Sequence, residues 1–301
     1  MKRQPQITWL KDGQRLHLQD GPIDLILQAD ANEADARAAY HAAIGRFTGL
    51  LDELCDELAL LRSAADPFQC NLRGVVARRM YAAVQPFAEN HFITPMAAVA
   101  GSVAEEILSA MTRAAPLNRA YVNNGGDIAL HLTATERFTI GLIDRPDAFG
   151  LLRTTIICAD DRCRGVATSG YRGRSFSLGI ADAVTVLASS AARADAAATI
   201  IANAVDLPDH GAIVRCPANE LQPDSDLGCR LVTRSVGPLT NSEIDSALSA
   251  GITKADLLLE TGLIDGAALC LQGDLRVIGL KKADASVLNR ITRLDEGMAH
   301  A

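Results

Sequence analysis

The sequence predicts an α/β (α+β) protein in which mixed and antiparallel sheets pack against helices. Segments with a two-residue apolar alternation open the chain and return in its middle third, and a helical period separates them. Apolar residues make up 49% and charged residues 22% of the 301 residues, a balance typical of a folded globular chain. Aromatic residues are only 4% and alanine is abundant, so we expect close contacts between helices.

The first third of the chain predicts a β meander followed by helices. Two Asp-Gly turn dipeptides separate three alternating segments within residues 1–30. A helical period then runs from residue 32 to a break at Pro67, with leucines on one stripe between residues 50 and 61 and two glycines that weaken its middle. Two further helices are expected at residues 72–84 and 96–113, with prolines at the breaks.

The middle third is rich in predicted strands. A glycine-rich loop at residues 168–179 precedes another strand and an alanine-rich helix that Ser189 or Ser190 could cap. The strands of this third are expected at residues 119–122, 127–132, 138–143, 152–159 and 183–188. We expect the third and fourth of these strands to lie beside the first two.

The last third predicts a strand, a helix and a hairpin. The strand is expected at residues 229–236, and the helix begins with a capping box from Thr240 to Glu243. Gly273 and Asp274 mark the turn of the hairpin. Because no linker, low-complexity tract or short repeat interrupts the chain, we expect residues 1–301 to form a single domain.

Charge and composition exclude several classes of protein. The net charge of −7 disfavours a nucleic-acid binder, which needs a basic face for the phosphates. The longest uncharged stretch, residues 90–104, is too short to span a membrane, and the start does not resemble a secretory signal. Seven cysteines without a Cys-x-x-Cys motif indicate a reduced, cytoplasmic protein.

A turn in the middle third is the first candidate site. Asn124, Gly125, Gly126 and Asp127 join two predicted strands. Paired glycines let backbone amides approach a ligand closely, and the adjacent carboxylate suits a ribose or a cation. A plain hairpin turn explains the same residues, since Asn-Gly is a strong hairpin signal.

The glycine-rich loop is the second candidate. Hydroxyl groups and glycines at Thr168, Ser169 and Gly170 precede Arg172 and Arg174, a mixture that suits phosphate oxygens. The loop matches neither a Walker A motif nor a dinucleotide fingerprint. A solvated loop with ordinary surface arginines explains it equally well.

Asp195 and Thr199 form the third candidate, four residues apart on the alanine-rich helix. Their oxygens share one helix face, and such hard donors suit Mg²⁺. In the alternative, Asp195 favours the positive end of its own helix and Thr199 bonds back to the preceding turn. Asp182, before the preceding strand, joins this site or ends a loop. Cys163 lies between two arginines, which would lower its thiol pKa, although a turn places it toward solvent.

Four blocks, in this order, resemble the ApbE superfamily, whose members include FAD:protein FMN transferases. Residues 95–102 resemble the helix start that reads Gly-Gly-Ile-Ala-Lys-Gly in that family. Residues 124–128 match its Gly-Gly-Asp-Ile turn and residues 167–170 its Ala-Thr-Ser-Gly. Residues 183–199 resemble its Ser-Val-Thr-Val strand and Ala-Asp-Ala-x-x-Thr helix. The likeness covers residues 95–205, which would form the motif-bearing core before a C-terminal segment at 206–301.

The resemblance implies an ApbE-like fold and a Mg²⁺ site. In the transferases the ion is held by the Asp and Thr of the helix motif and by a backbone carbonyl. Those positions here are Asp195, Thr199 and Ala100. The transferases also carry His-x-x-Asp-Pro-x-Thr-Gly, whereas residues 175–182 contain no His, Asp-Pro or Thr-Gly, and Gly101 replaces the motif lysine. The pattern looks closer to an uncharacterised cytoplasmic branch of the superfamily.

Three classes of function follow from these observations. The first is a cytoplasmic Mg²⁺-dependent enzyme acting on FAD or another nucleotide or phosphorylated cofactor, including a step in specialised cofactor synthesis. The second is a flavin- or nucleotide-binding protein that has lost catalysis. The third is a scaffold protein, whose melting temperature would not change when nucleotides or Mg²⁺ are added. The expected partners are small molecules, with neither nucleic acid nor membrane, and a homodimer is plausible.

Overall fold

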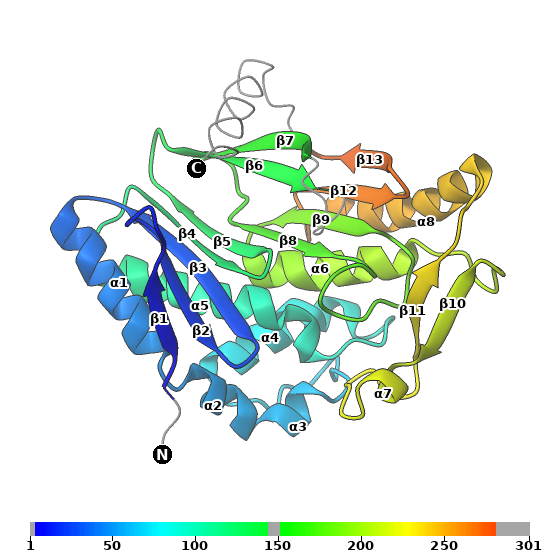
Figure 1. The fold of residues 1–301 in the computed structure, drawn as a ribbon, viewed down its shortest axis with the longest axis horizontal. Coiled ribbons are helices and arrows are strands. Elements are labelled where there is room, and N and C mark those ends of the chain that lie inside the picture. The colour runs from blue at the N-terminus through cyan, green and yellow to red at the C-terminus, as the bar shows by residue number, and fades with distance from the viewer. Residues whose placement is uncertain (1–3, 144–150, 281–301) are drawn as a thin grey trace.

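The computed structural model describes residues 4–143 and 151–280 (Figure 1). Its main element is a nine-stranded sheet in which every pair of neighbouring strands is antiparallel. The strands, in sheet order, are β1 (Gln6–Trp9), β2 (Leu16–Asp20), β3 (Ile23–Asp30), β4 (Arg119–Asn124), β5 (Asp127–Leu132), β8 (Gly165–Ser169), β9 (Ala183–Ala188), β12 (Gly266–Leu271) and β13 (Asp274–Ile278). The predicted meander is confirmed as β1 to β3, and the final hairpin as β12 and β13.

Two short ribbons lie outside this sheet. One pairs β6 (Arg137–Ile143) with β7 (Leu151–Cys158), and the other pairs β10 (Ile213–Pro217) with β11 (Leu231–Val236). The expectation that β6 and β7 lie beside β4 and β5 in one sheet is wrong, because β8 occupies the free edge of β5. Ile157 of β7 instead contributes to a small second core with Leu130 of β5 and Val166 of β8.

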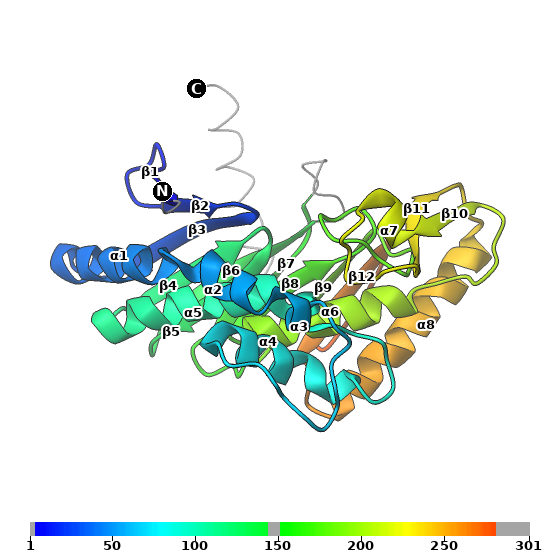
Figure 2. The same ribbon diagram turned by 90° about the horizontal axis from the view of Figure 1, so that it is seen from below.

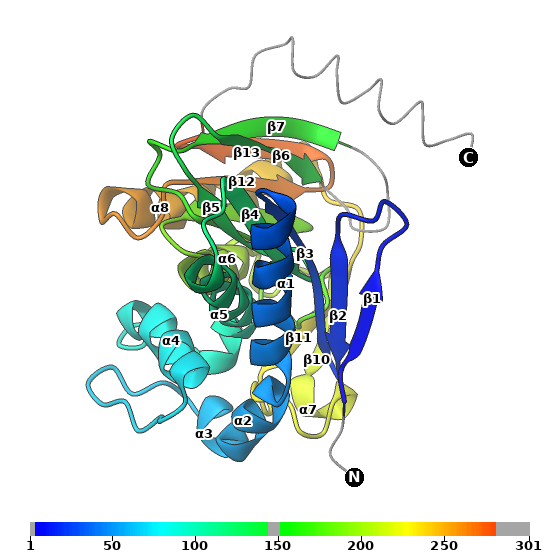
Figure 3. The ribbon, with the colours of Figure 1, turned by 90° about the vertical axis from the view of Figure 1, so that its left-hand side faces the viewer.

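The larger core lies between the main sheet and its helices (Figure 2). α5 packs on β4 and β5, α6 on β8 and β9, and α8 on β12, while α4 contacts the outer side of α5 and α6 (Figure 3). The helices are α1 (Glu33–Phe47), α2 (Leu50–Asp56), α3 (Leu58–Leu61), α4 (Val75–Val84), α5 (Val99–Ala114), α6 (Ala191–Ala204), α7 (Ala218–Leu221) and α8 (Asn241–Glu260), with short 3-10 turns at Gln85–Phe87 and Pro95–Ala98.

Local signals explain where several helices begin and end. Ser190 caps α6, and Thr240 and Glu243 form the predicted capping box of α8. The predicted helical segment is divided into three helices, since Gly49 adopts a left-handed conformation at φ +83° between α1 and α2, and Glu57 at φ −113° and ψ +13° lies between α2 and α3. No helix in residues 4–143 and 151–280 is long and apolar enough to cross a membrane.

α6 is the central helix of the core. Alanines are buried along most of its length, including Ala191, Ala194, Ala197 and Ala198. Such small side chains allow α5, α4 and α8 to approach it from several directions, as expected from the composition. The helix that carries Asp195 is therefore held on all sides by the fold.

Candidate functional site

The turn between β4 and β5 has the hairpin geometry that its sequence predicts. Asn124 pairs with Asp127, so Gly125 and Gly126 form a two-residue turn with φ values of +64° and +116°. The Asn123 side chain fixes the turn by accepting a hydrogen bond from the Gly126 amide at 2.8 Å. This geometry makes Asp127 the first residue of β5, facing β8.

Asp127 and Asp195 lie close together although they come from different elements. The carboxylate of Asp127 accepts a hydrogen bond from the Thr168 amide at 3.1 Å, and that of Asp195 accepts one from the Gly101 amide at 3.0 Å. Burial raises the pKa of Asp127 to about 7. Burial, and after it the charge of Asp127, raise the pKa of Asp195 well above the ordinary range.

The two carboxyl groups oppose each other's ionisation. Neither makes an ion pair with Lys, Arg or His in the described residues, and both side chains are half-buried. Because both pKa values are raised, binding of a proton relieves the repulsion between them when no cation is present. A cation bound between them would remove this repulsion.

Asp195 also stabilises a helix start, but not that of its own helix, as the alternative explanation from the sequence had it. It does not lie at the start of its own helix, where Ser190 is the cap. Instead its carboxylate accepts from the first amides of α5, whose own N-cap residue Ala98 provides no side-chain hydrogen bond. Asp195 thus caps α5 from a neighbouring helix.

Ala100 and Thr199 are neighbours of Asp195, Ala100 through its backbone amide and Thr199 one turn later on α6. The Ala100 carbonyl accepts a hydrogen bond from the Asn124 side-chain amide at 3.2 Å, which joins the start of α5 to the end of β4. Thr199 is half-buried one turn after Asp195 on α6. Its hydroxyl makes no hydrogen bond within the described part of the chain, whereas those of Thr253 and Thr261 bond back to the carbonyl four residues earlier.

The donors assembled here fit Mg²⁺ chemically. Two carboxylates, a carbonyl and a hydroxyl are hard oxygen ligands, and Mg²⁺ in proteins keeps several waters or phosphate oxygens in its octahedron. Such a site needs few protein side chains. Residues 4–143 and 151–280 contain no group of three or more His, Cys, Asp or Glu side chains that could hold a metal ion.

The glycine-rich segment begins as a strand rather than as a loop. Thr168 and Ser169 end β8, a strand that the sequence did not indicate, and the Thr168 hydroxyl bonds that of Thr185 at 2.9 Å. Gly170 has φ +154°, and a Cβ there would lie 2.5 Å from the Asp182 carbonyl oxygen. Only glycine allows the chain to leave the sheet at this point.

The two arginines of this segment have different surroundings. Arg172 forms an ion pair with the buried carboxylate of Asp182 at 2.5 Å, so Asp182 does not join the Asp127 and Asp195 pair. Arg174 lies over the hairpin turn, since a Cβ on Gly125 would be 3.1 Å from its guanidinium. Arg174 is exposed and has no acidic partner among the described residues. It is the arginine that this geometry leaves free for a ligand.

The structure corrects both predictions made for Cys163, that it faces solvent and that its thiol pKa is lowered. Its side chain is buried rather than turned toward solvent. Burial raises the pKa of its thiol to about 11, opposite to the direction that its arginine neighbours predict. Arg164 has little effect because its guanidinium turns back to the carbonyls of Ala159, Asp161 and Cys163.

Comparison with known proteins identifies the family. A family model described as "AbpE bacteria" matches residues 7–277. The chain belongs to this family. The resemblance to the ApbE superfamily is thereby confirmed.

This chain is also similar to archaeal proteins that carry the name UPF0280 protein. The one from Methanopyrus kandleri is 35% identical over 198 residues, which cover 64% of this chain and 74% of that protein. The one from Methanothermobacter thermautotrophicus is 41% identical over 121 residues, covering 39% and 44%. That from Methanosphaerula palustris is 38% identical over 123 residues, covering 38% and 47%. The second and third matches span less than half of the relative's length.

Two solved structures are more distant. The apo form of the Pseudomonas stutzeri flavinyl transferase ApbE is 12% identical with a TM-score of 0.47, over 92% of this chain and 95% of that one. The ApbE protein of Thermotoga maritima is 13% identical with a TM-score of 0.41, over 94% and 99%. Similarity at this level says nothing about ligands.

The structure gives a physical reason for one departure of this chain from the superfamily motif. Gly101 stands where the motif has lysine. A Cβ at Gly101 would lie 2.3 Å from the Ala191 carbonyl oxygen, because α5 and α6 touch at this point. No side chain larger than hydrogen fits there, so a lysine is excluded by packing.

Proposed function

We propose that this chain is a cytoplasmic Mg²⁺-dependent enzyme acting on FAD or on another nucleotide or phosphorylated cofactor. The pair formed by Asp127 and Asp195 carries the proposal. Full ionisation of two half-buried carboxyl groups without a basic partner is costly, and a cation between them would take the place of the proton that otherwise relieves this cost. Membership of the family supports the assignment of the site to nucleotide chemistry.

The residues of the site then take distinct roles. Asp195, Thr199 and the Ala100 carbonyl hold Mg²⁺, with Asp127 beside them, and the ion supplies charge stabilisation for a pyrophosphate and its leaving phosphate. Asn124 fixes the Ala100 carbonyl through the hydrogen bond at 3.2 Å. The Gly125–Gly126 turn and the Thr168–Gly170 segment line the ligand.

An alternative function is binding of a flavin or nucleotide without catalysis. The observation that favours it is the absence of His and Asp-Pro between residues 175 and 182. Both functions need the same metal and ligand contacts, so only product formation separates them. In either case the ligand is a small molecule, and we propose a homodimer as the assembly. The sheet supports one domain, because its strands come from every third of the chain.

The metal role can be tested by measuring FAD affinity with and without Mg²⁺. Titration of the purified chain, followed by flavin fluorescence, should give a dissociation constant at least about tenfold lower with Mg²⁺ than with EDTA. Equal affinities would contradict a metal-bridged pyrophosphate. Absence of FAD binding under both conditions would remove flavin from the proposal.

The two arginines provide a second test. Arg174→Gln should weaken nucleotide binding about tenfold, because it removes a charge-assisted contact, and should leave Tm within about 2 °C of wild type. Arg172→Gln should instead destabilise the chain by roughly 1–3 kcal/mol, since Asp182 would stay buried without its cation. Calorimetry for binding and urea unfolding for stability distinguish the two. The opposite assignment of effects would show that Arg172 is the ligand contact.

A further inference from the structure

The helices α5 and α6 cap each other with carboxylates. Asp195 on α6 accepts from the Gly101 amide at the start of α5 at 3.0 Å. In return, Glu105 on α5 accepts from the Ala192 amide at the start of α6 at 2.7 Å. Each helix start therefore depends on an acidic side chain of the other helix.

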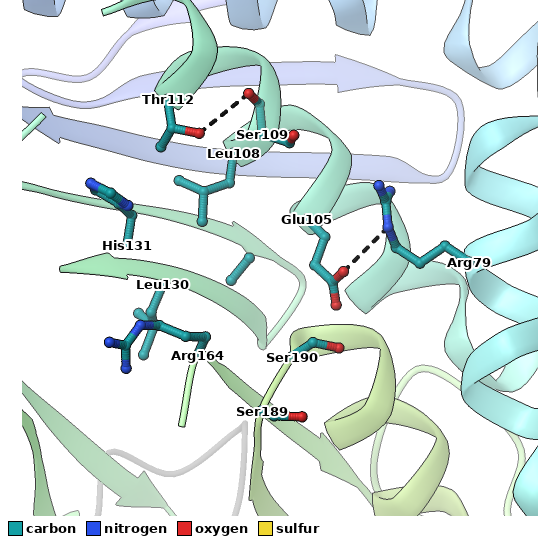
Figure 4. Close-up of a pocket in the computed structure, with 11 residues that line it drawn as sticks. Arg79, Glu105, Leu108, Ser109, Thr112, Leu130, His131, Arg164, Ser189 and Ser190 are labelled. Carbon is teal, nitrogen blue, oxygen red and sulfur yellow. Dashed lines mark hydrogen bonds and ion pairs between the residues drawn. The ribbon is translucent and has the colours of Figure 1, made fainter. Parts of the chain in front are cut away.

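Glu105 is itself held from the opposite side. Its second carboxylate oxygen lies 3.2 Å from Nε of Arg79 on α4, and Arg79 also donates to the Ser102 carbonyl at 3.1 Å. Figure 4 shows the Glu105 carboxylate between Arg79 and the start of α6 at Ser190, on the wall of a pocket of about 320 Å³. Arg79 also forms an ion pair with Glu106, and Glu106 forms a second ion pair with Arg46 of α1. An ion-pair network thus connects α4 and α1 to Glu105 on α5.

The packing beneath this network leaves little room for adjustment. At Gly101 a Cβ would lie 2.3 Å from the Ala191 carbonyl oxygen and 2.7 Å from the Ala192 nitrogen. The contact is immediately beside Ala100, and Asp195 follows one turn later on α6. A small shift of the start of α6 would therefore move the Asp195 carboxylate away from Gly101 and Ala100.

We propose that Glu105 is a positioning residue that fixes the Asp195 carboxylate against the start of α5, and through it the metal site. The metal part of this inference rests on the proposed function. Glu105 does not touch the metal or the ligand. It acts by anchoring the start of α6 to α5 through the Ala192 amide, while Arg79 holds its carboxylate in place.

The test compares three variants of the full chain. Glu105→Ala removes the anchor, and Glu105→Gln keeps an oxygen that can accept from the Ala192 amide. Glu106→Gln is the matched control, because it perturbs the same ion-pair network without any bond to α6. The first readout is hydrogen exchange of the Gly101 amide relative to that of Ala115, which bonds to the Met111 carbonyl at the other end of α5.

Glu105→Ala should make the Gly101 amide exchange about tenfold faster relative to Ala115, since general destabilisation would accelerate both amides together. Glu105→Gln should restore most of the protection, and Glu106→Gln should leave the ratio unchanged. Unchanged Gly101 protection in Glu105→Ala, or an equal loss in Glu106→Gln, would overturn the inference.

The second readout is the affinity for Mn²⁺ as a probe of the metal site. Loss of a residue that orients a metal ligand typically weakens affinity roughly 10- to 100-fold, so Glu105→Ala should fall in that range with Glu106→Gln close to wild type. Wild-type protein that binds no Mn²⁺ would contradict the proposed function. The exchange ratio would still decide whether Glu105 positions Asp195.

Discussion

Asp195→Asn is expected to abolish the binding of Mg²⁺ while leaving the fold intact. The amide oxygen of asparagine can still accept from the Gly101 amide, so the cap of α5 is retained. The negative charge and one metal ligand are lost, and Mg²⁺ binds neutral amides far less well than carboxylates. We expect Mg²⁺ affinity to fall at least about 100-fold.

The same variant is also expected to differ from wild type in stability, because Asp195→Asn removes the repulsion between Asp195 and Asp127. In the absence of metal, Asp195→Asn should be at least as stable as wild type, because it removes one of two adjacent half-buried carboxylates. Asp195→Ala should be less stable than Asp195→Asn by about 1–2 kcal/mol, since it also removes the cap. Titration calorimetry and thermal unfolding, each with EDTA and with Mg²⁺, provide both readouts. Wild-type affinity in Asp195→Asn would exclude this residue as a metal ligand.

Gly165→Ala is expected to cause the largest loss of stability. A Cβ on Gly165 would lie 2.1 Å from the Ala191 nitrogen and 2.3 Å from the Ser190 carbonyl oxygen. Both are backbone atoms that cannot move aside without displacing α6 from β8. Overpacking of this kind costs about 3 kcal/mol or more.

Gly45→Ala is the matched control for this substitution. Gly45 lies inside α1, and no atom comes within 4 Å of a Cβ built there. The change should stabilise the chain by about 0.5–1 kcal/mol, because alanine favours the helix. Urea unfolding measures both variants. A loss below about 1 kcal/mol in Gly165→Ala would show that β8 and α6 are farther apart than the structure has them.

Local sequence signals account for much of the fold. The Asp-Gly turns, the breaks at prolines and the capping box at Thr240 act within a few residues, so they could be recognised without the structure. β8 and β10 were missed because β8 is short and continues into a glycine-rich loop, and β10 is short and shows no regular alternation of buried and exposed residues. The separation of β6 and β7 depends on which strand occupies the edge of β5, which is a long-range pairing.

The candidate site was likewise only partly predictable from the sequence. Helical spacing was enough to place Asp195 and Thr199 on one face of α6. The approach of Asp127 to Asp195 could not be predicted from spacing, because it depends on how β5 and α6 pack together. Glu105 carries no motif at all, and its bond to the Ala192 amide exists only in the folded chain.

Release of AMP from FAD in the presence of Mg²⁺ tests the central claim most directly. The purified wild-type chain and Asp195→Asn would be incubated with FAD, and AMP and flavin binding followed together. The account predicts AMP and FMN from the wild-type chain with Mg²⁺, with water as the acceptor of the FMN phosphoryl group, and neither product with EDTA or in Asp195→Asn. Mg²⁺-dependent binding without AMP would favour the non-catalytic alternative, and AMP release by Asp195→Asn at the wild-type rate would contradict the account.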